Sequence, residues 1–316
     1  MKSVTTTATC LLVLALIQVT MSANVSTDAA SFFLEIQGNL TKIVWAHAVN
    51  SQVELDKALK SADIMMLEAD VVLGRLNGTN NTEIPIMAHP PANESTLSLD
   101  EFLRTVQNNT KKGIKLDFKS IEAFNASKPI LDKFRNDLKI PVFLNADILP
   151  GPVDATAKPV DAKAFLAQGK AYPDWTLSVG WTTRYGNKDN VTEGRYTGDQ
   201  IQKMIDELKE QKVTQPITYP VRAGLAAQDS DVIKTLMEKS SGMKNVTLTV
   251  WSSEGDKVDA EKLSTLIKDI GVTKVFVDVP QELMKSLRLS GASSVGVASI
   301  TLATTIFASV FLPTIL

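Results

Sequence analysis

The chain has little cysteine and histidine, and no excess of either charge. Cys10 is the only cysteine among 316 residues, the only histidines are His47 and His89, and the formal net charge is −2. A single thiol cannot form a disulfide within the chain, so a secreted form must rely on a hydrophobic core large enough to be stable without cross-links. The balanced charge offers no basic surface for nucleic acid, and we expect no such partner.

The N-terminus has the layout of a secretory signal peptide. Lys2 is followed by the apolar run Cys10–Ile17 and then by small residues around Ser22 and Ala23. The apolar run is too short to span a bilayer. We therefore predict a cleaved signal peptide over residues 1–23, which removes the cysteine, and a lead-in segment over residues 24–42.

The C-terminus carries a second targeting pattern. Residues 295–316 contain no charged side chain, and the small residues Ser290–Ser294 precede them. The tail has no lysine or arginine after it, whereas a membrane helix usually has basic residues on its cytoplasmic side. We predict a GPI-attachment signal over residues 290–316, with a C-terminal membrane tail as the alternative. The expected location is the extracellular cell surface, at the plasma membrane, where a C-terminal lipid anchor holds the protein.

Asn-X-Ser/Thr sequons agree with an exported protein. Nine in one chain with an export signal predict a glycosylated ectodomain. They lie at Asn24, Asn39, Asn77, Asn80, Asn93, Asn108, Asn125, Asn190 and Asn245.

Apolar segments of extended character alternate with segments of helical periodicity between the two ends. The expected strands are Ile43–Ala48, Ile64–Leu73, Gly113–Lys119, Pro141–Leu149, Thr176–Thr183, Ile217–Gly224, Asn245–Ser253 and Lys274–Pro280. Eight alternations over residues 43–289 favour a single-domain (β/α)8 TIM barrel. The rival is an open doubly wound sheet, but no Gly-rich phosphate loop follows the first strand. Amphipathic helices are expected at Thr197–Leu208 and Asp259–Ile267, and capping boxes at Ser51 and Ser98.

Acidic residues share one face where the second and third strands end. Glu68 and Asp70 are two residues apart, as are Asp117 and Lys119, so each pair projects to the same side of its strand. Three carboxylates at one spot would repel one another, and a divalent cation with oxygen ligands, Mg²⁺ or Ca²⁺, would relieve this. The alternative is a salt network in which the acids pair with Lys119 or Arg222.

Both histidines follow stretches of extended character, His47 after Ile43–Ala46 and His89 after Ile84–Ala88. An imidazole titrates near neutral pH and suits general acid–base catalysis, although an isolated histidine is more often a structural residue. Trp251, near a strand end, is a candidate for substrate contact, and packing is its alternative role.

This order of residues resembles the PLC-like phosphodiesterase superfamily, with glycerophosphodiester phosphodiesterases and sphingomyelinase D enzymes as the nearer parallels. The shared pattern is a histidine after strand one, Glu-X-Asp ending strand two, a histidine in the next loop and Asp-X-Lys on strand three. The resemblance implies a barrel enzyme that cleaves phosphodiesters. Its implied metal ligands are Glu68, Asp70 and Asp117, and its implied acid–base pair is His47 and His89.

The pattern also departs from those enzymes. Glycerophosphodiester phosphodiesterases usually have His-Arg-Gly and His-Asp where this chain has His47-Ala-Val and His89-Pro-Pro. Lys119 takes the place of the superfamily's phosphate-binding lysine. The missing arginine removes one phosphate contact, which Lys119 or Arg222 is expected to replace.

Longer phrases resemble the FAM151/menorin family more closely, from about residue 43 to residue 280. They are Val44–Ser51, Leu67–Val71, Pro85–Pro91, Gly113–Lys119, Val179–Thr183 and Tyr219–Arg222. The resemblance implies one of two functions. The first is a membrane-tethered, metal-dependent phosphodiesterase that acts on a glycerophosphodiester or phospholipid headgroup. The second is a catalytically weak or inactive cell-surface ligand that binds receptors in neuronal or tissue patterning.

Overall fold

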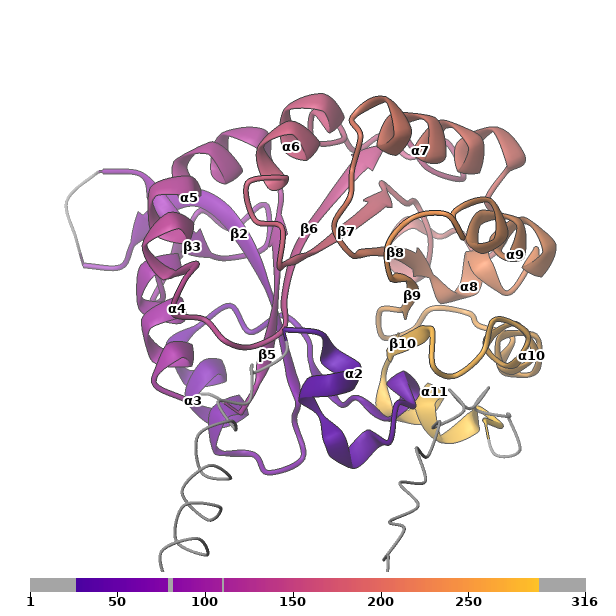
Figure 1. The fold of residues 1–316 in the computed structure, drawn as a ribbon, viewed down its shortest axis with the longest axis horizontal. Helices are drawn as coiled ribbons and strands as arrows, with labels where there is room; N and C mark the ends of the chain where they lie inside the picture. The colour runs from indigo at the N-terminus through magenta and orange to yellow at the C-terminus, as the bar shows by residue number, and fades with distance from the viewer. Residues whose placement is uncertain (1–26, 79–81, 110, 290–316) are drawn as a thin grey trace, which may run out of the picture.

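A computed structural model describes residues 27–78, 82–109 and 111–289. The predicted signal peptide, Asn24, Asn80 and the predicted C-terminal signal lie outside these residues. Within them, no helix combines the length and the apolar character needed to cross a membrane. Figure 1 shows a central sheet with a ring of helices around it.

Within the described residues, eight parallel strands form the central sheet and are neighbours in the order in which they occur along the chain. A doubly wound sheet would reverse that order at a switch point. The unbroken order excludes such a sheet and confirms the predicted single-domain (β/α)8 barrel, which is nearly closed. The strands are β1 (Trp45–Ala46), β2 (Met66–Leu76), β5 (Gly113–Phe118), β6 (Val142–Leu149), β7 (Thr176–Trp181), β8 (Ile217–Arg222), β9 (Val246–Trp251) and β10 (Val275–Asp278).

Side chains bring β1 and β10 together at the two ends of this sheet. The Trp45 ring lies 6.1 Å from the Phe276 ring and 6.2 Å from the Phe143 ring, measured between centroids. At the other end of the same strands, His47 Nδ1 is hydrogen-bonded to Asp278 Oδ2 at 3.0 Å. The gap between β1 and β10 is thus bridged by an aromatic cluster nearer the start of these strands and by a charged pair at their C-terminal ends.

The lead-in segment covers the N-terminal end of the barrel. It forms α2 (Ala29–Phe32), η1 (Leu34–Ile36) and η2 (Leu40–Lys42). Its buried side chains pack on the residues that begin the strands, and the cluster contains Phe33, Ile36, Leu40, Ile43, Met65, Met66, Phe143 and Phe276. The segment therefore stabilises the barrel floor.

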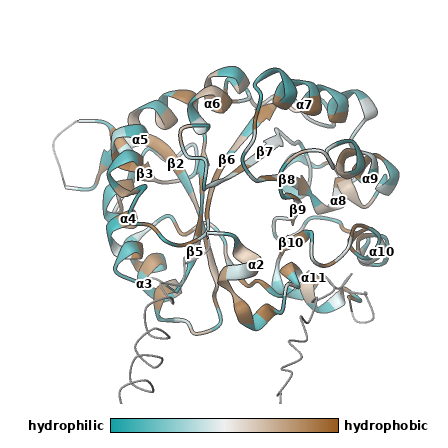
Figure 2. Ribbon diagram, in the orientation of Figure 1, coloured by the Kyte–Doolittle hydropathy of each residue, from teal (hydrophilic) through white to brown (hydrophobic). Residues whose placement is uncertain are grey.

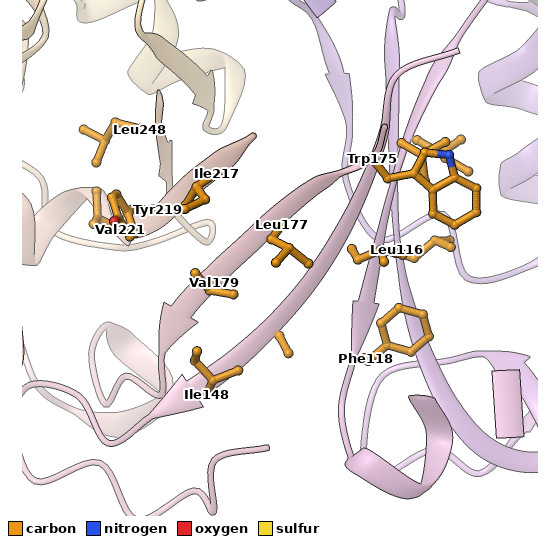
Figure 3. Packing of buried hydrophobic residues seen from close by; sticks show 14 of the residues in the cluster. Leu116, Phe118, Ile148, Trp175, Leu177, Val179, Ile217, Tyr219, Val221 and Leu248 are labelled. Atoms are coloured by element: carbon orange, nitrogen blue, oxygen red, sulfur yellow. The ribbon is translucent and has the colours of Figure 1, made fainter. Parts of the chain in front are cut away.

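Helices cover the outside of the barrel and turn their apolar faces to the strands (Figure 2). On β5, Leu116 and Phe118 point into this apolar layer (Figure 3), where the Phe118 ring lies 4.8 Å from that of Phe124. The helices are α3 (Gln52–Lys60), α4 (Leu99–Gln107), α5 (Ile121–Phe134), α6 (Ala162–Gly169), α7 (Gly198–Glu210), α8 (Ala223–Ala226), α9 (Ser230–Lys239), α10 (Ala260–Ile270) and α11 (Gln281–Ser286), with the short η3 (Asn187–Asp189). Helices α7 and α10 confirm the two amphipathic segments.

Serine hydroxyls cap α3 and α4 as predicted, but the reciprocal half of each capping box differs. Ser51 and Ser98 accept from the backbone N–H three residues later. The Glu54 carboxylate accepts instead from Asn50 N–H. A reciprocal capping box forms at Thr197 on α7, where the chain was predicted only to be helical.

A hairpin that the eight-strand pattern did not include rises from β2. Strand β2 continues past the barrel and pairs antiparallel with β3 (Ile84–Met87), from Val71 opposite Met87 to Gly74 opposite Ile84. A second short strand, β4 (Glu94–Ser95), pairs with the far end of β2. Because β3 runs back toward the barrel, the chain returns to the mouth, where Ala88 N–H donates to the Asp70 carbonyl at 3.1 Å.

Candidate active site

Three carboxylates converge inside the mouth of the barrel. In the strand register Asp70 lies opposite Asp117, and Glu68 lies opposite Lys115. Since Leu116 and Phe118 face the helices, the odd-numbered residues of β5 face the interior. Glu68 and Asp70 are only 2% and 4% exposed. One oxygen from each of Glu68, Asp70 and Asp117 lies within 4.8 Å of the others, which places the predicted ligands together.

A neutral donor holds one oxygen of each carboxylate. Such donors fix the orientation of a carboxylate without neutralising its charge. The three bonds run from Ala48 N–H to Glu68 Oε2 (2.8 Å), from Asn50 Nδ2 to Asp70 Oδ2 (2.8 Å) and from Asn145 Nδ2 to Asp117 Oδ1 (2.7 Å). The other oxygen of each group remains for a cation or a charged side chain.

Lys119 engages two of those remaining oxygens. Its Nζ lies 2.7 Å from Asp70 Oδ1 and 2.6 Å from Asp117 Oδ2. Burial lowers the pKa of Lys119, but the charges of Asp117, Asp70 and Glu68 outweigh it and raise the pKa well above its usual value. Burial raises the pKa of Asp117, and the charges of Lys119 and Lys115 more than reverse this. Lys119 thus forms ion pairs of the kind expected for the salt network that is the alternative to a cation site.

Lys115 is a second interior cation that the sequence argument did not assign. It is 4% exposed and faces the barrel interior beside Glu68. Burial, together with the charges of Asp70 and Asp117, raises the pKa of Glu68, while the charges of His47 and Lys115 lower it. The available signal was parity, since Lys115 shares a face with Asp117 and Lys119 in one short strand.

His47 lies at the closure between β1 and β10. Its Nδ1 is 3.0 Å from Asp278 Oδ2 and 3.5 Å from Glu68 Oε2, and its side chain is half-exposed. Burial lowers the pKa of His47, but the charge of Glu68 and the hydrogen bond and charge of Asp278 raise it to about 9. The ring is therefore protonated at neutral pH. Nδ1 donates to Asp278 Oδ2, which leaves Nε2 for a ligand.

His89 lies at the end of the hairpin where the chain returns to the barrel. It follows β3, one residue after the Ala88 N–H that bonds the Asp70 carbonyl. Its side chain is exposed, and its Nδ1 lies 2.7 Å from the Pro90 carbonyl oxygen. The hairpin thus brings the backbone next to His89 into contact with the backbone of Asp70, whereas the His47 ring itself lies beside the Glu68 carboxylate.

Arg222 lies in an ion pair that ties two rim loops together. Its Nε and Nη2 donate to the two oxygens of Asp256 at 2.8 and 2.9 Å, and its Nη1 donates to Thr183 at 3.3 Å. The guanidinium lies over the Trp251 ring at 5.1 Å and the Tyr185 ring at 5.6 Å. The structure therefore gives Arg222 and Trp251 a shared packing arrangement, and their predicted role in substrate binding stays a prediction.

Asp147 is a further acid at the mouth with no predicted role. It lies on β6, two residues after Asn145, and therefore on the same face. Burial and the charge of Asp117 raise the pKa of Asp147 to about 7. Beyond it, a cleft of about 480 Å³ opens between the ends of β6 and β7 and the start of α7. Trp181 lines this cleft, which shares no lining residue with the carboxylate cluster.

Most of the described sequon asparagines are exposed. Asn39 differs, because it is partly buried and its side-chain oxygen accepts from the Thr41 N–H and hydroxyl. Accessibility thus favours the others as attachment points, and glycosylation stays a prediction. The exposed asparagines are Asn77, Asn93, Asn108, Asn125, Asn190 and Asn245.

Comparison with solved structures gives only weak similarities, of which two serve as examples. The GH26 domain of an endo-beta-mannanase/endo-beta-glucanase from Prevotella bryantii has 10% identity and a TM-score of 0.45, covering 81% of this chain and 90% of its own. The GH53 catalytic domain from Ignisphaera aggregans has 14% identity and a TM-score of 0.44, covering 77% and 84%. Similarity at this level says nothing about the reaction.

The sequence matches are stronger. Residues 39–284 match the profile of the Menorin N-terminal domain. The Homo sapiens protein FAM151B is 38% identical over 239 residues, which cover 75% of this chain and 82% of the human protein. The resemblance that the motif phrases indicated is therefore confirmed, and the chain belongs to the FAM151/menorin family.

Proposed function

We propose that this protein is a divalent-metal-dependent phosphodiesterase that acts on a glycerophosphodiester or a phospholipid headgroup. The observation that carries the proposal is the set of three inward carboxylates, each held by a neutral donor, with the His47 ring beside Glu68. The superfamily resemblance of the Glu-X-Asp and Asp-X-Lys motifs supports the choice of substrate class.

The donor set fits a hard cation. Its three side-chain ligands are all oxygens, which favours Mg²⁺ or Ca²⁺ over zinc. Two ligands that each lie about 2.0–2.6 Å from one ion cannot be more than about 5 Å apart. The observed separations of at most 4.8 Å satisfy that limit at Ca²⁺–oxygen distances. Glu68, Asp70 and Asp117 would hold the ion.

The protein's own groups would divide the remaining work. When bound, the ion supplies Lewis-acid polarisation of the phosphate. The Lys119 ammonium would hold a non-bridging oxygen and its developing charge. His47, whose Nδ1 is held by Asp278, suits donation of a proton to the leaving oxygen through Nε2. His89 then takes the role of base toward water or a substrate hydroxyl.

A surface ligand with a weak or inactive site is the second candidate function. Its support is that Lys119 already pairs with two of the three acids and Asp256 already pairs with Arg222. In that case the same barrel would bind cell-surface receptors.

Under either function we place the glycosylated protein on the extracellular face of the plasma membrane through its C-terminal lipid anchor. A phosphatidylinositol-specific phospholipase should release it from cells, and retention after this treatment would contradict the anchor.

Calorimetric titration tests the cation site. The full-length protein should bind Mg²⁺ or Ca²⁺, and Asp70→Asn should weaken binding at least about tenfold because it removes one anionic ligand. Asp137→Asn is the matched control, since Asp137 is exposed and lies in the loop that follows α5. Equal affinities in wild type and Asp70→Asn would rule out the proposed ligand set.

A further inference from the structure

We propose that Lys119 is an internal counter-ion that competes with the divalent cation for Asp70 and Asp117. Cation binding would then displace its ammonium from the carboxylates and turn it toward the substrate side of the mouth. This inference rests on the proposed function, because it assumes that the three carboxylates bind a cation.

The competition follows from which oxygens Lys119 uses. Asn50 and Asn145 hold Asp70 Oδ2 and Asp117 Oδ1. The opposite oxygens, Oδ1 of Asp70 and Oδ2 of Asp117, are the ones that Lys119 Nζ contacts at 2.7 and 2.6 Å. A cation that takes these oxygens needs the space next to them. It would also repel an ammonium a few ångströms away, at an energy worth more than a tenfold change in affinity.

The side chain of Lys119 has room to leave. It is 24% exposed, whereas the carboxylates it contacts are mostly covered. Lys119 comes directly after the last residue of β5, and its backbone is fixed because its N–H donates to the Val71 carbonyl at 3.1 Å. Rotation of the long side chain alone would carry the ammonium outward. A freed ammonium at the mouth is placed to meet an anionic group that enters from solvent.

Lys115 provides a matched comparison. It has the same charge, lies on the same strand and faces the same interior, but it is 4% exposed. Among the described residues, the three carboxylates have no hydrogen bond or ion pair to Lys115 Nζ. Removing Lys115 therefore changes the charge near the cation, whereas removing Lys119 changes the charge and also frees the two carboxylate oxygens.

Titration with Mg²⁺ and with Ca²⁺ tests the proposal on full-length wild type, Lys119→Met, Lys115→Met and Asp70→Asn. Lys119→Met should bind the cation at least about tenfold more tightly than wild type, and more tightly than Lys115→Met. An unchanged or lower affinity in Lys119→Met would overturn the competition, as would equal gains in the two lysine variants. Absence of binding in wild type and both lysine variants would instead contradict the cation site itself.

Amine labelling gives a second readout that needs no variant. The full-length protein is treated briefly with acetic anhydride, with EDTA or with saturating Ca²⁺, and each lysine is quantified by peptide mass spectrometry. Lys119 should be acetylated several-fold faster with Ca²⁺, because an amine that has left the two carboxylates is more accessible to the reagent. Lys115 should change little. Equal rates for Lys119 in both conditions would overturn the proposal even if Lys119→Met fails to fold.

Discussion

Replacing His47 or His89 with asparagine should reduce cation-dependent phosphodiester hydrolysis by roughly 10²- to 10⁴-fold, the usual contribution of one general acid or base. The His47 ring lies beside the Glu68 carboxylate, and His89 follows the residue whose N–H bonds the Asp70 carbonyl. An in-line displacement needs one proton donor and one acceptor, so either loss should remove most of the rate. The measurement is the initial rate of each variant at saturating cation. Activity that survives both substitutions would make the histidines structural.

The melting temperature as a function of pH tests whether the neighbouring carboxylates stabilise the protonated His47 ring. The pKa of its ring is raised from 6.5 to about 9, so the folded state binds the proton more tightly than the unfolded state. The stabilisation is complete below pH 6.5 and is lost as the pH rises through about 9. In EDTA at pH 6.5, wild type should have a higher melting temperature than His47→Asn. The melting temperatures of the two proteins should converge above pH 9. A gap that widens with pH would show that the neighbouring carboxylates do not favour the charged ring.

Replacing Arg222 with methionine should lower the free energy of unfolding by about 3–5 kcal/mol, because it leaves the carboxylate of Asp256 buried without its partner. The side chain of Asp256 is 1% exposed and accepts two hydrogen bonds from the guanidinium of Arg222. Arg222 also donates to Thr183, in the loop after β7, and lies over the ring of Trp251 at the end of β9. Urea denaturation of wild type and variant measures the change.

Two comparisons sharpen this experiment. Arg184→Met is the matched control, since Arg184 is exposed nearby, and its effect should stay within about 0.5 kcal/mol. The double variant Arg222→Met with Asp256→Asn should be less destabilised than the sum of the two single variants. Equal unfolding midpoints for Arg222→Met and Arg184→Met would show that the ion pair is not a structural clamp and would return Arg222 to the substrate role predicted from the sequence.

The barrel could be predicted because its signal is periodic. A parallel strand that is buried on both faces reads as a short apolar run in the sequence. In this chain such runs alternate with amphipathic helical segments. The same periodicity did not predict the hairpin formed by β2 and β3. Residues 84–87 are also apolar and extended, but they pair antiparallel with the end of β2 outside the barrel. Strand pairing depends on contacts distant in sequence, and period alone does not distinguish a ninth barrel strand from a return strand.

The charged cluster was predictable to the same extent. Parity along a strand places Glu68 with Asp70 and Asp117 with Lys119, and the register then brings the two pairs side by side. Which donor holds which oxygen was not readable, because Asn50 reaches Asp70 from a loop after β1. The partner of His47 was hidden for a related reason. Asp278 is 231 residues away and meets it only when the barrel closes.

The most direct measurement of the central claim is hydrolysis by the purified, glycosylated full-length protein. A panel of glycerophosphodiesters and lysophospholipids would be assayed with Mg²⁺, with Ca²⁺ and with EDTA, and His47→Ala would serve as the background. We expect at least one substrate to be cleaved with a cation, EDTA to abolish the reaction, and His47→Ala to be inactive. A wild-type protein that cleaves no phosphodiester under any of these conditions, yet binds a cell-surface receptor, would contradict the enzymatic account and favour the ligand function.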